Sequence, residues 1–147
     1  MERVLIKKLV NSAKIPTRGS NNSAGYDLYA VTNEDFISIT PHTSVKIGTG
    51  ISMAIPDGYF GAIFARSGLA TREGLRPANC VGVIDSDYRG EIMVSVYNDH
   101  STTRFITPGE RIAQIVFLPY KSVEFDEVLR LPTTVRGEGG FGSTGKE

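Results

Sequence analysis

The sequence lacks the long 3.6-residue hydrophobic repeat of amphipathic helices. Short runs rich in Val, Ile, Tyr and Phe recur instead, and Gly, Pro, Asn and Asp interrupt them. Such runs predict strands, at Val4–Leu9, Tyr26–Ala30, Phe36–Ile39, Ser44–Ile47, Ile51–Ile55, Tyr59–Phe64, Val81–Ile84, Glu91–Tyr97, Arg104–Ile106 and Ile112–Leu118. Many short strands favour an all-β sandwich, jelly roll or barrel. Only Ser67–Glu73 is typical of a helix, with Ser67 as its cap and Gly74 at its end.

Length and charge limit the classes of protein that fit. The 147 residues suit one domain, spanning 1–147. The 16 Lys and Arg residues balance the 16 Asp and Glu residues. No net field therefore draws the chain to nucleic acid or to an anionic membrane, and we expect neither partner. Any bound anion must be held by local groups.

The cysteine content and the N-terminal region indicate a cellular compartment. Cys80 is the single cysteine, so no intrachain disulfide can form, and a cytoplasmic location is expected. The first 15 residues carry charges throughout and contain no apolar block of signal-peptide length. The longest apolar stretch, Ile115–Leu118, is far too short to span a membrane.

The last residues form a glycine-rich tail, from about 133 to 147, that we expect to be mobile when alone. Residues 140–146 nearly match the P-loop pattern, but Glu147 follows where that pattern requires Ser or Thr. Two interpretations remain: a frayed terminus, or a segment whose backbone N–H groups cradle phosphate oxygens. In the second, Arg136 adds a planar donor group and Phe141 offers its face to a base.

Two polar segments could bind an anion or activate water. Arg66, Ser67 and Gly68 precede the short helix, which is consistent either with an anion site or with an ordinary Ser-capped helix. Residues 79–90 resemble a β-hairpin that carries Asp85 and Asp87 near its turn. Those carboxylates could deprotonate a water, bind Ca²⁺ or Mg²⁺, or only shape the turn.

Two residues in predicted strands, Asp27 and Gln114, are also candidates for a functional site. Asp27 lies inside an aromatic strand, where a buried carboxylate needs a partner or a shifted pKa. Gln114 lies in a strand, as a surface residue or as an amide that donates to phosphate oxygens. Other catalytic sets are missing: His42 and His100 have no metal-ligand spacing, and Cys80 has no evident His partner.

Taken in order, these segments resemble the five signature segments of the homotrimeric deoxyuridine triphosphatases (dUTPases, or dUTP diphosphatases). They are Ala24–Ala30, Ala65–Ala70, Asn79–Glu91, Pro108–Gln114 and Arg136–Gly145. The resemblance covers nearly the whole chain. It implies a jelly-roll-like β-barrel and a homotrimer whose three active sites each use segments of all three subunits.

The resemblance also implies roles for individual residues. Asp85 would activate the water that attacks the α-phosphorus of dUTP, giving dUMP and pyrophosphate. This keeps uracil out of DNA and supplies dUMP for thymidylate synthesis. The uracil and deoxyribose would be bound by Asn79, Val83, Ile84, Tyr88, Met93 and Phe141. The phosphates would be bound by Arg66, Ser67, Gly68, Gln114, Arg136, Gly142 and Ser143.

Magnesium is the cofactor that the resemblance implies. Mg²⁺ would be chelated mainly by the triphosphate, with Asp27 contacting it through water and no direct protein ligand. Ala65 departs from the family pattern, which usually has Pro there, and Cys80 has no assigned role. Two alternatives stay open: a dCTP deaminase, for which no general-acid Glu is evident, and a non-catalytic nucleotide-sensing module.

Overall fold

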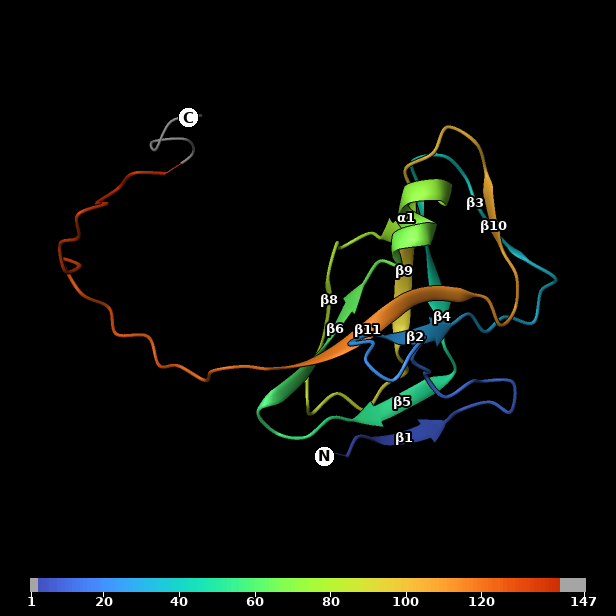
Figure 1. Cartoon of the computed structure of the whole chain (residues 1–147), viewed down its shortest axis with the longest axis horizontal. Helices are drawn as coiled ribbons and strands as arrows, with labels where there is room; N and C mark the ends of the chain where they lie inside the picture. Colours follow the sequence, from blue (N-terminus) through green and yellow to red (C-terminus); the bar gives the residue numbers. More distant parts are fainter. Residues whose placement is uncertain (1–2, 141–147) are drawn as a thin grey trace.

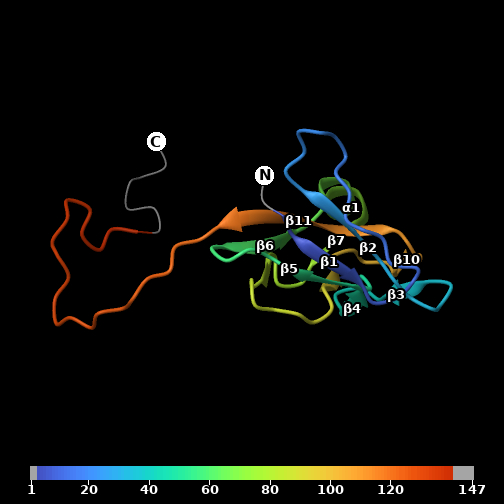
Figure 2. The ribbon, with the colours of Figure 1, turned by 90° about the horizontal axis from the view of Figure 1, so that it is seen from below.

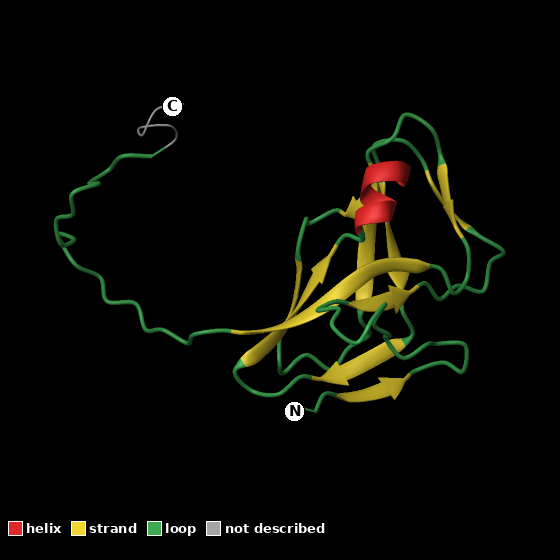
Figure 3. Cartoon of the chain, viewed as in Figure 1, coloured by secondary structure: helices red, strands yellow, loops and turns green. Residues whose placement is uncertain are grey.

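The computed structural model describes residues 3–140 and shows a mostly β molecule with one short helix (Figures 1 and 3). Its elements in chain order are β1 (Leu5–Lys8), β2 (Tyr26–Tyr29), β3 (Ile37–Ile39), β4 (Ser44–Gly48), β5 (Ile51–Ala54), β6 (Tyr59–Phe64), α1 (Ser67–Glu73), β7 (Leu75–Pro77), β8 (Gly82–Ile84), β9 (Met93–Asn98), β10 (Arg104–Ile106) and β11 (Arg111–Pro119). The all-β prediction is confirmed, and each predicted strand is found with its ends shifted by at most two residues.

The strands form four antiparallel sheets. The largest has the order β2-β11-β6-β8, and a second has the order β4-β9-β7. The pairs β1-β5 and β3-β10 complete the set. None of these sheets closes on itself within residues 3–140. The jelly-roll-like barrel therefore stays a prediction of the resemblance.

The core takes buried residues from all four sheets, and β9 contributes alternate residues to it. On β9, Val94, Val96 and Asn98 are buried while the residues between them are partly exposed, as expected for a strand with one covered face. The buried Asn98 is fully bonded: its amide nitrogen donates to the carbonyls of Ile39 (2.9 Å) and Thr102 (2.8 Å). Those bonds offset the cost of burying an amide.

Two sequence predictions about local structure need correction. The segment 79–90 is not a paired hairpin, because β8 pairs only with β6 whereas β9 lies between β4 and β7. Ser67 is the first residue of α1 and not its cap: the N-cap position is Arg66, whose side chain makes no capping hydrogen bond. The predicted end is confirmed, since Gly74 adopts the left-handed conformation (φ 66°) that glycine favours.

Beyond β11 the chain leaves the body as an extended arm, residues 121–140, without a helix or strand (Figure 2). Tyr120 is the last residue held to the body, through its N–H to the Gly58 carbonyl (3.0 Å) and its ring against Phe60. All the large apolar side chains on the arm are exposed, and several almost fully, among them Phe125 at 95% and Leu131 at 82%. In the described part of the chain, no helix is both long and apolar enough to cross a membrane.

Candidate active site

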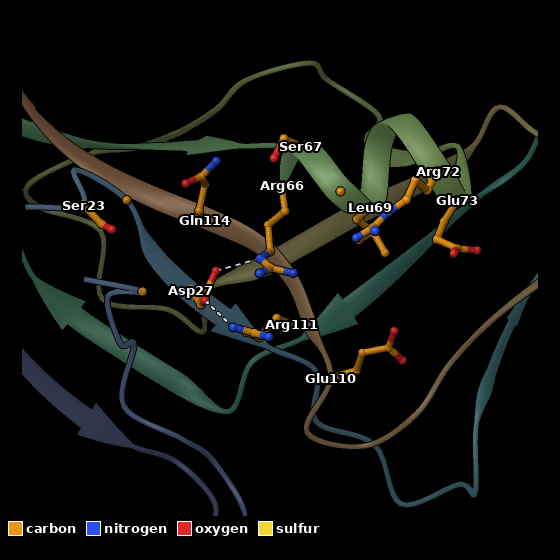
Figure 4. Close-up of a pocket in the computed structure, with 13 residues that line it drawn as sticks. Ser23, Asp27, Arg66, Ser67, Leu69, Arg72, Glu73, Glu110, Arg111 and Gln114 are labelled. Atoms are coloured by element: carbon orange, nitrogen blue, oxygen red, sulfur yellow. Dashed lines mark hydrogen bonds and ion pairs between the residues drawn. The ribbon is translucent and has the colours of Figure 1, made fainter.

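A cavity of about 600 Å³ opens where β2, β11 and the start of α1 meet, and we call it the Asp27 pocket (Figure 4). Its lining is mostly polar: Gly19, Ser23, Gly25, Asp27, Arg66, Ser67, Gly68, Leu69, Arg72, Glu73, Glu110, Arg111 and Gln114. Four residues predicted to bind phosphates, and the residue predicted to face the metal, therefore line one cavity.

Strand register explains why residues so distant in sequence meet there. Gln114 of β11 lies opposite Asp27 of β2 on one side and opposite Phe64 of β6 on the other. The chain leaves β6 at Phe64, so Arg66 follows at the same edge of the sheet. Three neighbouring strands thus bring Asp27, Gln114 and Arg66 together.

The carboxylate of Asp27 is bonded to two cations. Arg66 Nε lies 2.7 Å from Oδ1, and Arg111 Nη1 lies 3.3 Å from Oδ2 (Figure 4). The Asp27 side chain is only 13% exposed, so these cations offset the cost of removing its charge from water. Of the alternatives that the sequence left open for Asp27, the structure shows the paired one.

Arg66 keeps donors available after this contact. Asp27 engages its Nε, and the described residues supply no hydrogen-bond acceptor to its Nη atoms. A guanidinium presents five N–H donors in a planar fork that suits phosphate oxygens. The ion pair therefore orients Arg66 while leaving donor groups for an anion in the pocket.

Gln114 is half-buried and its amide is fixed by the backbone. Nε2 donates to the carbonyl oxygen of Ala65, at 2.8 Å. Gly25 makes this arrangement possible, because a Cβ there would lie 3.0 Å from Gln114 Cδ and would collide with the amide oxygen. Glycine at position 25 thus allows the Gln114 side chain of the neighbouring strand to lie close to the backbone.

Ser67 and Gly68 line the pocket at the start of α1. Ser67 is exposed, and its carbonyl accepts the Thr71 hydroxyl at 2.6 Å. At Gly68 a Cβ would lie 2.8 Å from Nη2 of Arg72, so the absence of a side chain lets this guanidinium approach the backbone. Arg72 thereby adds positive charge beside the residues that were predicted to bind phosphate.

A second, smaller cavity of about 290 Å³ forms the Tyr88 pocket, lined by Lys46, Val83, Ile84, Asp85, Tyr88, Glu91 and Met93. Four of these seven residues, Val83, Ile84, Tyr88 and Met93, were predicted to bind uracil and deoxyribose, and Asp85 was predicted to activate water. Lys46 and Glu91 had no predicted role. The Asp85 side chain is exposed and makes no ion pair or hydrogen bond with the described residues. Its carboxylate oxygens therefore keep lone pairs that a bound water could approach.

Residues 85–91 form a compact turn and not an extended segment. The Tyr88 N–H bonds the Asp85 carbonyl at 3.2 Å, and the Arg89 guanidinium donates to the carbonyls of Ser86 (2.6 Å) and Tyr88 (3.0 Å). Asp85 and Asp87 therefore lie in a turn and not on an extended strand. Only Asp85 of the two lines the pocket.

Some predicted residues lie outside both pockets. Asn79 is exposed and does not line the Tyr88 pocket. Arg136 lies on the arm, where its Nε donates to the Gly139 carbonyl at 2.8 Å. Phe141, Gly142 and Ser143 are outside the described residues. The two pockets share no lining residue within one chain.

Charged residues that sequence reasoning missed also line the pockets: Lys46, Arg72, Glu73, Glu91, Glu110 and Arg111. Glu110 and Arg111 sit inside the Pro108–Gln114 segment, so their proximity to Gln114 was the available signal. No sequence signal pointed to Lys46, because its place beside the pocket depends on the pairing of β4 with β9.

Comparison with known proteins shows the family of this chain. Residues 11–145 match the dUTPase family model. The chain is 45% identical to the deoxyuridine 5'-triphosphate nucleotidohydrolase of Corynebacterium glutamicum, over 97% of this chain and 95% of that one. It is 44% identical to the protein of the same name from Paramecium bursaria Chlorella virus 1, over 99% of both.

The fold has a solved counterpart as well. The Staphylococcus bacteriophage 80alpha dUTPase, solved with dUPNHPP, superposes with a TM-score of 0.89 at 28% identity and covers 99% of each chain. The family match and the near-full-length relatives place the chain among the nucleotide hydrolases. The chain belongs to the dUTPase family, which confirms the family that the sequence segments indicated.

Proposed function

We propose that this protein hydrolyses dUTP to dUMP and pyrophosphate. The observation that carries the proposal is the pair of pockets: one is lined by arginines with free donors, and the other holds an unpaired carboxylate beside a tyrosine ring. Most of their lining residues lie in the family's signature segments. The activity would keep uracil out of DNA and supply dUMP for thymidylate synthesis.

The Tyr88 pocket is the proposed nucleoside site. Uracil would meet backbone groups of Val83, Ile84 and Met93, with Asn79 at the edge of the base. The Tyr88 ring would lie against the sugar, where it leaves no room for a 2′-hydroxyl. Exclusion by a fixed side chain discriminates against the larger substrate through a steric clash.

The Asp27 pocket is the proposed phosphate site. Arg66 would contribute its free Nη donors, Ser67 its hydroxyl, and Gly68 and Gln114 their N–H groups. Preorganised donors of this kind stabilise charge that develops during phosphoryl transfer. Arg136, Gly142 and Ser143 would add donors to the phosphates, and Phe141 would stack on uracil.

Asp85 is the proposed general base. Its carboxylate accepts a proton from a water whose oxygen attacks the α-phosphorus. A new P–O bond forms, and the bond from the α-phosphorus to the bridging oxygen of the β-phosphate breaks. The electron pair of that bond leaves with pyrophosphate, and the proton later returns to solvent or product.

The cofactor would be Mg²⁺ bound mainly by the triphosphate. Within residues 3–140, no group of three or more His, Cys, Asp or Glu side chains could form a protein cage for a metal. Both oxygens of Asp27 are engaged by arginines, yet each keeps a lone pair that can accept from a metal-bound water. Mg²⁺ retains waters readily, and it would neutralise charge on the phosphates.

A homotrimer with shared sites would bring the two pockets together on one substrate. Two features support this assembly: the pockets share no lining residue within one chain, and the arm carries exposed apolar side chains that need a covering surface. Light scattering coupled to size exclusion should give the mass of three chains. An active monomer would contradict the shared site.

The activity is tested by measuring pyrophosphate release from dUTP, dTTP, dCTP and UTP, with and without Mg²⁺. We expect turnover of dUTP alone, dependent on Mg²⁺. Equal turnover of dTTP would contradict the proposal, and ammonia release from dCTP would indicate the deaminase. Deletion of the tail after Pro132 should abolish turnover, whereas a non-catalytic module would keep its nucleotide binding.

A further inference from the structure

Glu91 lines the Tyr88 pocket but has no role in the proposed chemistry. Its carboxylate oxygen Oε1 accepts the backbone N–H of Gly50 at 2.8 Å, across 41 positions of sequence. None of the described cations lies within ion-pair distance of it. The carboxylate therefore acts as a hydrogen-bond acceptor that joins the Tyr88 loop to the turn between β4 and β5.

The β4-β5 turn is shaped to receive this carboxylate. A Cβ at Gly48 would lie 3.2 Å from Glu91 Cδ and 2.5 Å from Oε1, so only glycine leaves the space. Gly50 has a φ of 66°, a left-handed conformation that points its N–H toward the carboxylate and that suits glycine. Gly48 thus leaves room for the Glu91 side chain, and Gly50 supplies the N–H that it accepts.

Further bonds hold the same two segments together. The Thr49 hydroxyl donates to the Ile92 carbonyl at 2.6 Å, and the Ile92 N–H donates to the Ile51 carbonyl at 2.8 Å. Thr49 and Ile92 are buried. The backbone at Glu91 is therefore anchored to the core of the protein.

Tyr88 is fixed to this anchor. Its hydroxyl donates to the Glu91 carbonyl oxygen at 3.0 Å. Its ring lies over Gly90, where a Cβ would come within 2.6 Å of ring atom Cζ. Tyr88 itself is 44% exposed, so few contacts with the core hold the ring in place. Its position depends on the segment Gly90–Glu91 and on whatever holds that segment.

We propose that Glu91 is a positioning residue, which fixes the Tyr88 ring through the Gly50 bond and so sets the discrimination between deoxyribose and ribose nucleotides. The inference rests on the proposed role of Tyr88 at the sugar. A ring that is held still excludes a 2′-hydroxyl, whereas a ring free to swing aside admits it. Removal of the Gly50 bond should therefore weaken selectivity more than it weakens turnover of dUTP.

The test compares kcat/KM for dUTP and for UTP in the full chain and in three variants. Glu91→Ala removes the acceptor, and the dUTP-to-UTP ratio should fall about tenfold, the effect of losing one hydrogen bond. Glu91→Gln is the matched control: its amide oxygen still accepts from Gly50, so the ratio should stay within about twofold. Tyr88→Phe keeps the ring but loses the bond to Glu91, and its ratio should also fall.

The outcomes separate this inference from the proposed function. If the unaltered protein fails to prefer dUTP, the proposed function itself is wrong. If it prefers dUTP and Glu91→Ala keeps the full ratio, only the positioning role is wrong. A Gln variant as impaired as the Ala variant would mean that the charge matters, which also overturns the inference. Should Glu91→Ala not fold, Tyr88→Phe decides: an unchanged ratio would contradict the role.

Discussion

The two pockets are built in opposite ways. The Asp27 pocket gathers side chains from β2, β11 and α1, and ion pairs span up to 84 positions of sequence there. The Tyr88 pocket is made mostly from the single segment between Val83 and Met93, and hydrogen bonds to backbone carbonyls hold its loop. One pocket therefore depends on charge and on the whole sheet, and the other on one loop and its attachment to the β4-β5 turn.

This difference matches the two parts of a nucleoside triphosphate. A triphosphate is recognised by charge, which acts over several ångströms and tolerates small displacements. A base and a sugar are recognised by shape and by hydrogen bonds, which lose strength steeply when the geometry changes. We therefore expect the Asp27 pocket to respond to charge changes and salt, and the Tyr88 pocket to respond to small steric changes.

The largest effect should come from Asp85→Asn. The amide keeps the size of the side chain but cannot take a proton from water, so kcat should fall about 10³-fold while KM changes little. Steady-state pyrophosphate release measures both constants. An active Asn variant would remove Asp85 from the reaction, and a large rise in KM would assign it to binding instead.

Asp27→Asn should have the next largest effect, on stability. The substitution leaves Arg66, 29% exposed, and Arg111 without a charged partner. We expect a loss of about 2 kcal/mol in the free energy of unfolding, measured by urea denaturation. An unchanged midpoint would mean that the ion pairs do not hold the pocket together.

The need for a partner at Asp27 was predictable, but the partners were not. A carboxylate in an aromatic strand must be compensated, whatever the fold. Arg66 and Arg111 lie 39 and 84 positions away, and only the order β2-β11-β6 brings them close. Strand propensity predicts that a segment is a strand, whereas its neighbours follow from long-range packing.

The dependence on long-range packing also explains which sequence predictions were wrong or missing. The alternation in 91–97 predicted a half-buried strand correctly, but the pairing of β9 with β4 and β7 replaced the expected hairpin. β7 was missed because it has three residues and ends in Pro77, which cannot donate to a ladder. Glu91 was missed because its acceptor role requires the β4-β5 turn as a neighbour.

Two glycine substitutions offer a matched comparison between the pockets. Neither Gly25 nor Gly90 has a positive φ, so alanine is acceptable to the backbone and only the new contact acts. Gly25→Ala should displace Gln114 and raise KM for dUTP about tenfold, a cost of overpacking. Gly90→Ala should displace the Tyr88 ring and change mainly the preference for dUTP over UTP. If the two variants changed the same kinetic constant, the separate roles proposed for the two pockets would be wrong.

A change in salt concentration should also affect the two pockets differently, with a smaller effect than the substitutions above. Raising NaCl from about 50 mM to about 500 mM shortens the screening length from about 14 Å to about 4 Å. KM for dUTP should rise several-fold, because the proposed phosphate site relies on partly exposed guanidinium groups such as that of Arg66. The inhibition constant of deoxyuridine, which has no phosphate, should barely change. A parallel rise of both constants would contradict charge-based recognition.

The smallest effect should come from Asp99→Asn, which tests whether any ion pair matters or only one inside a pocket. Arg76 binds Asp99 through two contacts, Nε to Oδ2 at 2.6 Å and Nη2 to Oδ1 at 3.2 Å. This geometry rivals that of Asp27 with Arg66, but here the side chains are 35% and 46% exposed. Water screens such a pair, so the loss should be about 0.5 kcal/mol or less, with unchanged kinetics.

The pH dependence of this pair follows from the direction of the shift. The hydrogen bond to Asp99 raises the pKa of Arg76 above its ordinary value, while burial acts in the opposite direction. A raised pKa contributes stability below the unfolded pKa and loses it only as pH rises through the folded one. Both values lie far above neutrality, so the small difference between Asp99→Asn and the unaltered protein should not change between about pH 6 and pH 9. A loss as large as that of Asp27→Asn would show that contact geometry, and not burial within the pocket, decides what an ion pair contributes in this fold.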